Sequence, residues 1–177
     1  FRPIVLTTKT ENLDQYPVAP IYLYRPPFEG KSKLAVRASV ALDRLFARRE
    51  HFYVKSIKQE KAALIHAHFG PQGWMNLGTR RKSGAPMITT FYGYDVVRLP
   101  QSSPKWRQRY ARLFAEGDGF LAEGPHMGRC LAELGCPPEK IHVQHLGVDV
   151  DRIAFVERRQ ITGQPVRILM AATFREK

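Results

Sequence analysis

Short apolar runs that alternate with helix-like patterns constrain the fold of this chain more than any other feature. The runs 64–69 (LIHAHF) and 87–92 (MITTFY) are rich in β-branched or aromatic residues and end at glycine, which is typical of strands. Between such runs, apolar residues recur at spacings of three and four, which predicts helices. Strands that alternate with helices predict an α/β fold, a doubly wound, mostly parallel Rossmann-like sheet with helices on both faces.

The same patterns give the boundaries of the elements and of the domains. Strands are expected at 3–8, 20–24, 64–69, 87–92, 119–123, 141–146 and 166–172, and helices at 34–50, 55–63, 72–82, 105–116 and 125–134. After Gly147 the sequence becomes polar and rich in turn residues. We therefore expect one domain over 1–147, a linker over 148–165, and the first strand of a second domain over 166–177.

Composition narrows the class of protein. With 44% hydrophobic and 25% charged residues the chain is neither disordered nor fibrous, and no apolar run approaches the roughly 20 residues that span a bilayer. Cys130 and Cys136 form neither a disulfide framework nor a common zinc pattern, so no metal site is predicted and a reducing compartment is favoured. The motifs of serine hydrolases, P-loop nucleotidases and zinc peptidases are absent from the sequence.

Polar and aromatic residues cluster where three of the predicted strands end. In open parallel sheets, ligands bind at the carboxyl ends of the strands. The candidates are His66, His68 and Gly70 after one strand, Tyr92, Gly93, Tyr94 and Asp95 after the next, and Glu123, Gly124 and His126 after the third. Structural roles remain open for several of them. Either histidine is also consistent with a satisfied core residue, and Asp95 and Glu123 are also consistent with caps of backbone N–H groups.

Three sequence blocks resemble a known family. They are 63–73 (ALIHAHFGPQG), 85–98 (APMITTFYGYDVVR) and 120–155 (FLAEGPHMGRCLAELGCPPEKIHVQHLGVDVDRIAF). Together they resemble the N-terminal half of family 4 (group 1) retaining glycosyltransferases of the GT-B architecture, especially those of bacterial exopolysaccharide and lipopolysaccharide synthesis. Residues 166–177 similarly resemble the opening of the C-terminal domain in that family.

The resemblance implies that this chain is the acceptor-binding half of such an enzyme, truncated at both ends and lacking its first β-α unit. The missing C-terminal domain would bind the nucleotide-sugar donor, so this part of the protein holds no cofactor and is expected to be inactive alone. The parent enzyme would transfer a hexosyl group to a saccharide or lipid-linked acceptor in cell-surface polysaccharide synthesis, with retention of anomeric configuration.

The resemblance also implies roles for the strand-end residues. The catalytic candidates are Tyr92, His68 and Asp95, and the substrate-binding candidates are Gly70, Gly93, Tyr94, Glu123 and His126. Tyr92 stands where relatives often have a histidine. Because a phenol keeps its proton at neutral pH, we expect Tyr92 to position the reacting groups rather than to transfer a proton.

The net charge of +12 is concentrated in part on residues 98–112, where basic side chains alternate with aromatic ones. The predicted membrane surface consists of Arg98, Lys105, Trp106, Arg107, Arg109 and Arg112. With the resemblance, it suggests a cytoplasmic protein bound to the anionic inner face of the plasma membrane. In the alternative interpretation, Trp106, Tyr110 and Leu113 face the core and the cations are merely solvated. A second basic cluster lies at 80–82.

A non-catalytic basic module that binds nucleic acid or sugar phosphates is the rival class, since a pI near 10.0 also suits phosphate backbones. The sequence has no recognisable nucleic-acid-binding motif, so no nucleic-acid partner is expected.

Overall fold

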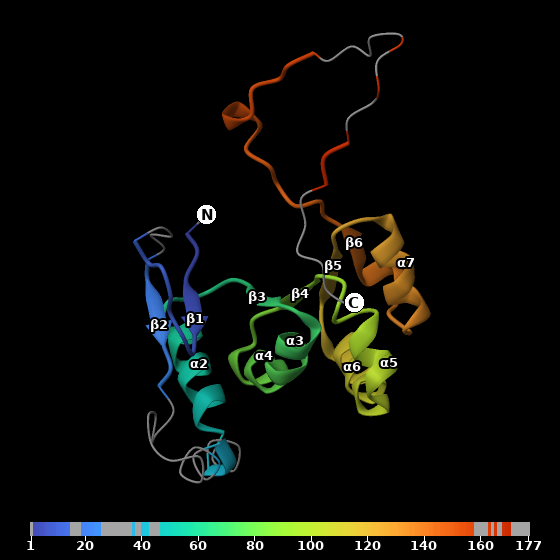
Figure 1. Ribbon diagram of the computed structural model, residues 1–177. Helices are drawn as coiled ribbons and strands as arrows, with labels where there is room; N and C mark the ends of the chain where they lie inside the picture. The colour runs from blue at the N-terminus through green and yellow to red at the C-terminus, as the bar shows by residue number, and fades with distance from the viewer. Residues whose placement is uncertain are drawn as a thin grey trace.

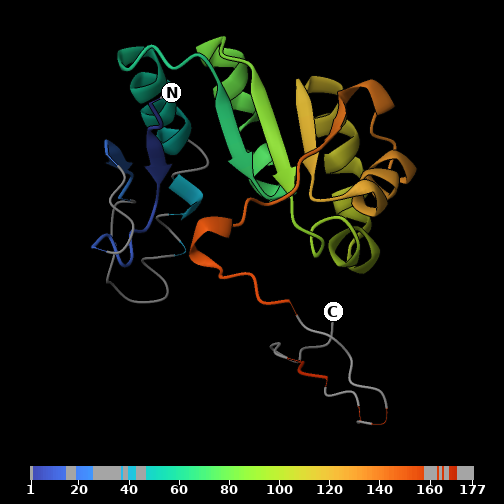
Figure 2. The ribbon, with the colours of Figure 1, turned by 90° about the horizontal axis from the view of Figure 1, so that it is seen from above.

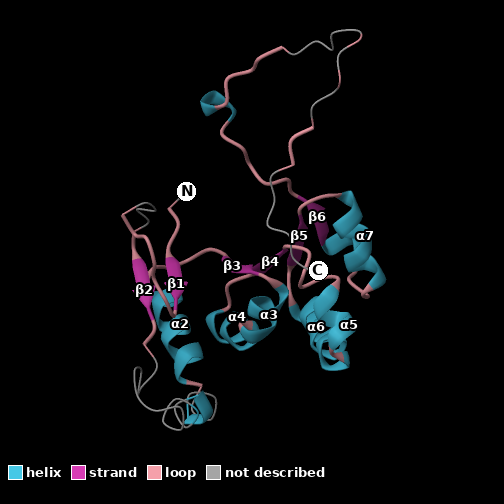
Figure 3. Cartoon of the chain, viewed as in Figure 1, coloured by secondary structure: helices cyan, strands magenta, loops and turns pink. Residues whose placement is uncertain are grey.

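The computed structural model describes residues 2–14, 19–25, 37, 40–42, 47–157, 163, 165 and 168–170. Within them the chain forms two parallel sheets with connecting helices, and this confirms the predicted parallel α/β class (Figure 3). The strands are β1 (Val5–Thr7), β2 (Ile21–Leu23), β3 (Ile65–His68), β4 (Met87–Phe91), β5 (Gly119–Ala122) and β6 (Ile141–Val143). The helices are α2 (Arg48–Gln59), α3 (Gly70–Met75), α4 (Leu77–Ser83), α5 (Arg98–Ser102), α6 (Pro104–Glu116) and α7 (Pro125–Glu133), with 3-10 turns at Pro138–Lys140 and Val150–Arg152.

The sheets are separate in the described structure. One contains β1 and β2, and the other has the order β3-β4-β5-β6, with every neighbouring pair parallel. In Figure 1, α2 stands beside β1 and β2, while α3 to α7 accompany the larger sheet. The chain leaves β6 and leads away from both sheets.

The larger sheet is covered by helices on the side that carries the core. Strands added in chain order by right-handed connections place their connecting helices on one side. Helices α3, α4 and α6 accordingly lie below the strands in Figure 1 and behind them in Figure 2. Ala67, Thr89, Phe91 and Phe120 are buried on this side, whereas the neighbouring His66 and His68 of β3 are exposed.

Aromatic rings fill the centre of this core. Phe91, Tyr110, Phe114 and Phe120 are each at most 1% exposed, and they meet edge to face: Phe91 with Tyr110 at 5.6 Å and Phe114 with Phe120 at 5.2 Å between centroids. Edge-to-face contacts add to the gain from burial. Rings that interlock in this way leave little room for an added atom.

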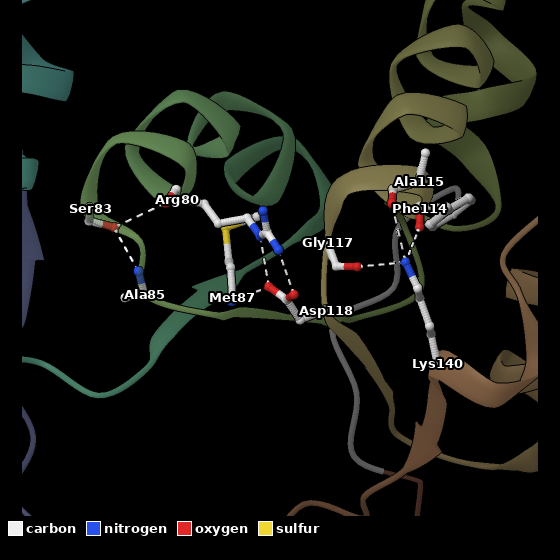
Figure 4. Close-up of polar contacts among 9 residues, drawn as sticks. All are labelled: Arg80, Ser83, Ala85, Met87, Phe114, Ala115, Gly117, Asp118 and Lys140. Carbon is white, nitrogen blue, oxygen red and sulfur yellow. Dashed lines mark hydrogen bonds and ion pairs between the residues drawn. The ribbon is translucent and has the colours of Figure 1, made fainter.

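Ionic contacts close the end of the sheet opposite the candidate site (Figure 4). The Arg80 guanidinium donates two hydrogen bonds to the Asp118 carboxylate, at 2.7 and 2.6 Å, and the backbone N–H of Met87 donates a third at 2.7 Å. The hydrogen bonds from Arg80 hold the pKa of Asp118 below its usual value. The Lys140 ammonium donates to the carbonyl oxygens of Phe114, Ala115 and Gly117, where it satisfies the end of α6.

Several predicted boundaries are wrong. The helix expected at 72–82 begins at Gly70 and divides at Asn76 into α3 and α4. The sequence suggested only that the preceding strand ends at Gly70-Pro71, but proline fits the first turn of a helix because its missing N–H would be unpaired there. Two helices were expected at 34–50 and 55–63, with a break between them. The structure instead has one continuous helix, α2, across that break. Most of the range 34–50 lies outside the described residues. The short helix α5 was not predicted.

The described residues near the C-terminus form no strand. Residues 168–170 are in no strand, and the rest of the strand expected at 166–172 lies outside the described residues. Over the described part of the chain, no helix has the length and apolar character that crossing a membrane requires.

Candidate functional site

Asp95 joins the loops that follow β3 and β4. Its side chain is 1% exposed, and its two carboxylate oxygens accept hydrogen bonds from the backbone N–H groups of Gly70 at 2.8 Å and Tyr92 at 2.9 Å. The Tyr110 hydroxyl donates to the Asp95 carbonyl oxygen at 2.8 Å. Burial and the nearby Asp95 carboxylate raise the pKa of Tyr110, so its hydroxyl remains a donor. This carboxylate, predicted as catalytic, is engaged by backbone and fixes the two loops.

His68 and Tyr92 form a hydrogen-bonded pair where β3 and β4 end. His68 Nδ1 lies 2.6 Å from the Tyr92 hydroxyl oxygen, and the two rings are nearly parallel at 13°. When the phenol donates to Nδ1, the imidazole carries its own proton on Nε2, on the far side of the ring. His68 is exposed, so Nε2 can meet a ligand. The structure therefore brings together three strand-end candidates, because Asp95 accepts from the Tyr92 N–H and the Tyr92 hydroxyl is bonded to His68.

His66 lies beside this pair on the same face of β3. Its ring centroid is 4.3 Å from that of His68, and its Nε2 is 2.7 Å from the Thr90 hydroxyl. Desolvation, with a smaller contribution from the neighbouring His68, lowers the pKa of His66 and leaves it neutral at pH 7. Because both histidines are exposed, the alternative that they are core residues is wrong for this structure.

Phe69 is a site residue that sequence reasoning missed. Its ring is 49% exposed and lies 4.7 Å from the Tyr92 ring between centroids, and its backbone has φ 71° and ψ 140°. Tyr94, a predicted substrate-binding residue, is 62% exposed nearby in the chain. The sequence showed Phe69 only as the apolar end of a strand, since the sign of φ leaves no compositional signal at a residue other than glycine.

The other substrate-binding candidates are placed less directly. The N–H of Gly70 is bonded to Asp95 and is not free for a ligand. Gly93 has φ 94° and turns the chain after β4. Glu123 is partly buried after β5, and His126 is exposed in α7, where its Nε2 lies 3.7 Å from Cys130 Sγ. Neither is bonded to His68 or Tyr92 in the described structure.

Among the residues that the structure describes, no group of three or more His, Cys, Asp or Glu side chains is arranged to hold a metal ion. Burial raises the pKa of Cys136 to about 12, so this thiol stays protonated at neutral pH.

In the predicted membrane surface, some basic side chains are exposed and others are engaged by neighbouring side chains. Arg98, Lys105 and Arg107 are exposed, whereas Arg112 forms an ion pair with Glu116 at 2.6 Å. Arg109 lies over the rings of Trp74 and Trp106, 4.4 and 4.5 Å from their centroids, and Trp106 packs against the core. Tyr110 and Leu113 are fully buried, as the core-stripe alternative expected.

Each cation of the second basic cluster, at 80–82, forms an ion pair. Arg80 pairs with Asp118, Arg81 with Glu116, and Lys82 with Glu50. Three paired cations attract an anionic surface less than three free ones.

Comparison with known proteins identifies the family to which a chain with this fold and this candidate site belongs. The family model for Glycosyltransferase Family 4 matches residues 1–152. The chain therefore belongs to glycosyltransferase family 4.

Curated relatives are similar over about two thirds of the chain. WcaL of Salmonella typhimurium, named for colanic acid biosynthesis, is 34% identical over 120 residues, which are 66% of this chain and 29% of that protein. AmsK of Erwinia amylovora, named as an amylovoran biosynthesis glycosyltransferase, is 30% identical over 118 residues, 66% of this chain and 28% of its own length. WcaL of Escherichia coli is 31% identical over 123 residues, again 66% and 29%. The chain thus spans less than a third of the length of these relatives.

Proposed function

We propose that this chain is the acceptor-binding half of a glycosyltransferase that acts in the synthesis of a cell-surface polysaccharide. The full protein would transfer a hexosyl group from a nucleotide-sugar to a saccharide or lipid-linked acceptor with retention of configuration. Family membership and the names of the relatives support the class of reaction. The observation that supports this particular site is the hydrogen bond between His68 and Tyr92 at the carboxyl ends of the strands.

In this proposal each residue of the edge has one task. The exposed Nε2 of His68 meets the acceptor hydroxyl and orients it toward the donor, while the Tyr92 phenol fixes the imidazole ring through Nδ1. Asp95 touches neither substrate. It positions both loops, so that a reacting hydroxyl is held in place before the donor arrives.

The domain organisation expected from the sequence is part of the proposal. A hollow lined in part by the apolar residues Ile4, Leu6, Leu64 and Ala67 and by the polar residues His66, Asn76 and Thr79 lies between β1 and β3, which are the facing edge strands of the two sheets in Figure 1. A parallel strand of a further β-α unit in this hollow would join the two sheets. The donor-binding domain would follow the linker at 148–165, where exposed apolar residues such as Ile153 and Phe155 offer a contact.

The test measures turnover of a panel of nucleotide-sugars by the full-length protein, with products identified by mass. We expect one donor to be turned over, and His68→Ala or Tyr92→Phe to lower the rate by about tenfold or more, which is about 1.4 kcal/mol of transition-state stabilisation. His51→Ala, an exposed histidine on α2, is the matched control and should retain the wild-type rate. The present chain alone should turn over no donor.

Two results would count against this proposal. Full wild-type rates in both variants would remove His68 and Tyr92 from the reaction. No turnover of any donor by a folded full-length protein, even with lipid-linked acceptors added, would favour a non-catalytic module that binds sugar phosphates.

We also propose that the exposed cations around α5 and α6 hold this half at the anionic cytoplasmic face of the membrane. The support is that Arg98 and Lys105 are exposed and form no ion pair with the described residues, while Arg109 covers two tryptophan rings. Each cation near anionic headgroups contributes about 1 kcal/mol to binding.

Vesicle sedimentation at fixed salt tests this surface. Binding to phosphatidylglycerol vesicles should fall by about tenfold or more in the Arg98→Glu, Lys105→Glu double variant. The matched control, Lys55→Glu with Lys58→Glu, reverses two exposed cations of α2 and should bind as wild type. Equal binding of a nonspecific oligonucleotide, or equal loss in both double variants, would leave only a general basic surface and support the rival class.

A further inference from the structure

Phe69 occupies a backbone conformation that glycine normally provides. Its φ of 71° and ψ of 140° lie close to a region in which a side chain is strained against its own backbone. Residues in such conformations persist only where their surroundings fix them, and they concentrate at functional sites.

The surrounding contacts fix this conformation. The Phe69 N–H donates to the Thr90 carbonyl oxygen at 2.8 Å, and the next N–H, of Gly70, is bonded to Asp95. The Phe69 carbonyl oxygen accepts from Gln72 and Gly73 at 3.0 and 3.2 Å, in the first turn of α3. A glycine would make the same backbone bonds without strain. The strain at this position therefore comes from the Cβ atom, which any residue other than glycine carries.

Burial of the phenyl ring does little to offset this strain, because the ring is only half buried. It is 49% exposed, whereas the nearby core rings Phe91 and Phe120 are fully buried. Its neighbour is Tyr92, with the planes inclined at 49°, and Tyr92 is hydrogen-bonded to His68. Phe69 and Tyr92 thus form an inclined pair of rings immediately beside an exposed imidazole.

We propose that Phe69 and Tyr92 form an aromatic platform that binds one pyranose ring of the acceptor. The C–H groups on the less polar face of a pyranose pack against the electron-rich faces of aromatic rings. A puckered ring suits two inclined planes, and its hydroxyl groups would lie within reach of His68. A flat nucleobase suits one plane better. This inference rests on the proposed function, because it names the ligand class at the same edge of the sheet.

The test is saturation-transfer NMR on the full-length protein with methyl glycosides of glucose, galactose, mannose and fucose as probes. We expect transfer to the ring protons of at least one glycoside, and a dissociation constant raised about tenfold or more in Phe69→Ala. Phe69→Leu keeps an apolar side chain but lacks the π face, and should also bind weakly. Leu13→Ala, which truncates an apolar side chain of similar exposure, 47%, in the chain between β1 and β2, is the matched control and should bind as wild type.

Phe69→Gly separates the platform from a structural role. This variant should lose glycoside binding and yet unfold at a temperature about 2 °C or more above the wild type, since the strain is removed. A structural role alone would predict that losing the ring lowers the unfolding temperature. Wild-type affinity in Phe69→Ala and Phe69→Leu, or no glycoside bound by the wild type, would overturn the platform.

Failure of the platform can be told apart from failure of the proposed function. If the wild type turns over a nucleotide-sugar but the Phe69 variants bind glycosides normally, the platform falls and the transferase stands. If no donor is turned over but glycoside binding depends on Phe69, the platform stands and the transferase falls.

Discussion

Replacing Gly70 with alanine is expected to lower the free energy of unfolding by about 3 kcal/mol. A Cβ at this position would lie 2.4 Å from Cε1 of Phe91 and 2.5 Å from the hydroxyl oxygen of Tyr110. Neither ring can withdraw easily, because both are fully buried, they pack edge to face, and the Tyr110 hydroxyl is bonded to Asp95. The added methyl group must therefore move α3 away from the sheet or break this packing.

Urea unfolding followed by tryptophan fluorescence measures this loss, because Trp74 and Trp106 lie in helices that pack on the same core. Gly124→Ala is the matched control: Gly124 has extended backbone at φ −169°, and a Cβ there would meet nothing within 4 Å. A loss below about 1 kcal/mol in Gly70→Ala, or equal losses in both variants, would show that α3 is not held against Phe91 and Tyr110 as described.

The order of strands and helices from residue 64 onward could be predicted because apolar residues are spaced differently in strands and in helices. Residues 64–69 and 87–92 are short and apolar, and the observed β3 and β4 fall inside them. The break at Asn76 and the short helix at 98–102 could not be predicted, since pieces of five to seven residues carry too few turns to show a helical period.

The division into two sheets also had no signal in the sequence. The strand runs at 3–8 and 20–24 indicate strands but not their partners. Among the described residues β1 pairs with β2, with Val5 opposite Ile21, and with no strand of the larger sheet. Pairing depends on which edges the connections bring together, and that information is not local.

The candidate site was predictable in location but not in roles. Parallel strands place their carboxyl ends at one edge, and His68, Tyr92 and Asp95 do meet there. The buried Asp95 carboxylate is instead bonded to the backbone N–H of Gly70, 25 residues away in the chain, and no local pattern shows this. The same limit applies to the basic residues: Arg80 and Arg81 find their acidic partners 38 and 35 residues further on.

Asp95→Asn should be almost as damaging as the change at Gly70, with about 2 to 4 kcal/mol lost from the free energy of unfolding. Both carboxylate oxygens accept a backbone N–H in a site that excludes water. An amide keeps one oxygen, but its NH₂ group must face either the Gly70 or the Tyr92 N–H, so that two buried donors oppose each other. The matched control is Asp151→Asn, which changes an exposed carboxylate in the 3-10 turn Val150–Arg152 and should leave stability unchanged. The same urea titration measures both. A loss below about 1 kcal/mol would mean that the loops after β3 and β4 hold their positions without this carboxylate, and the positioning role of Asp95 would have to be abandoned.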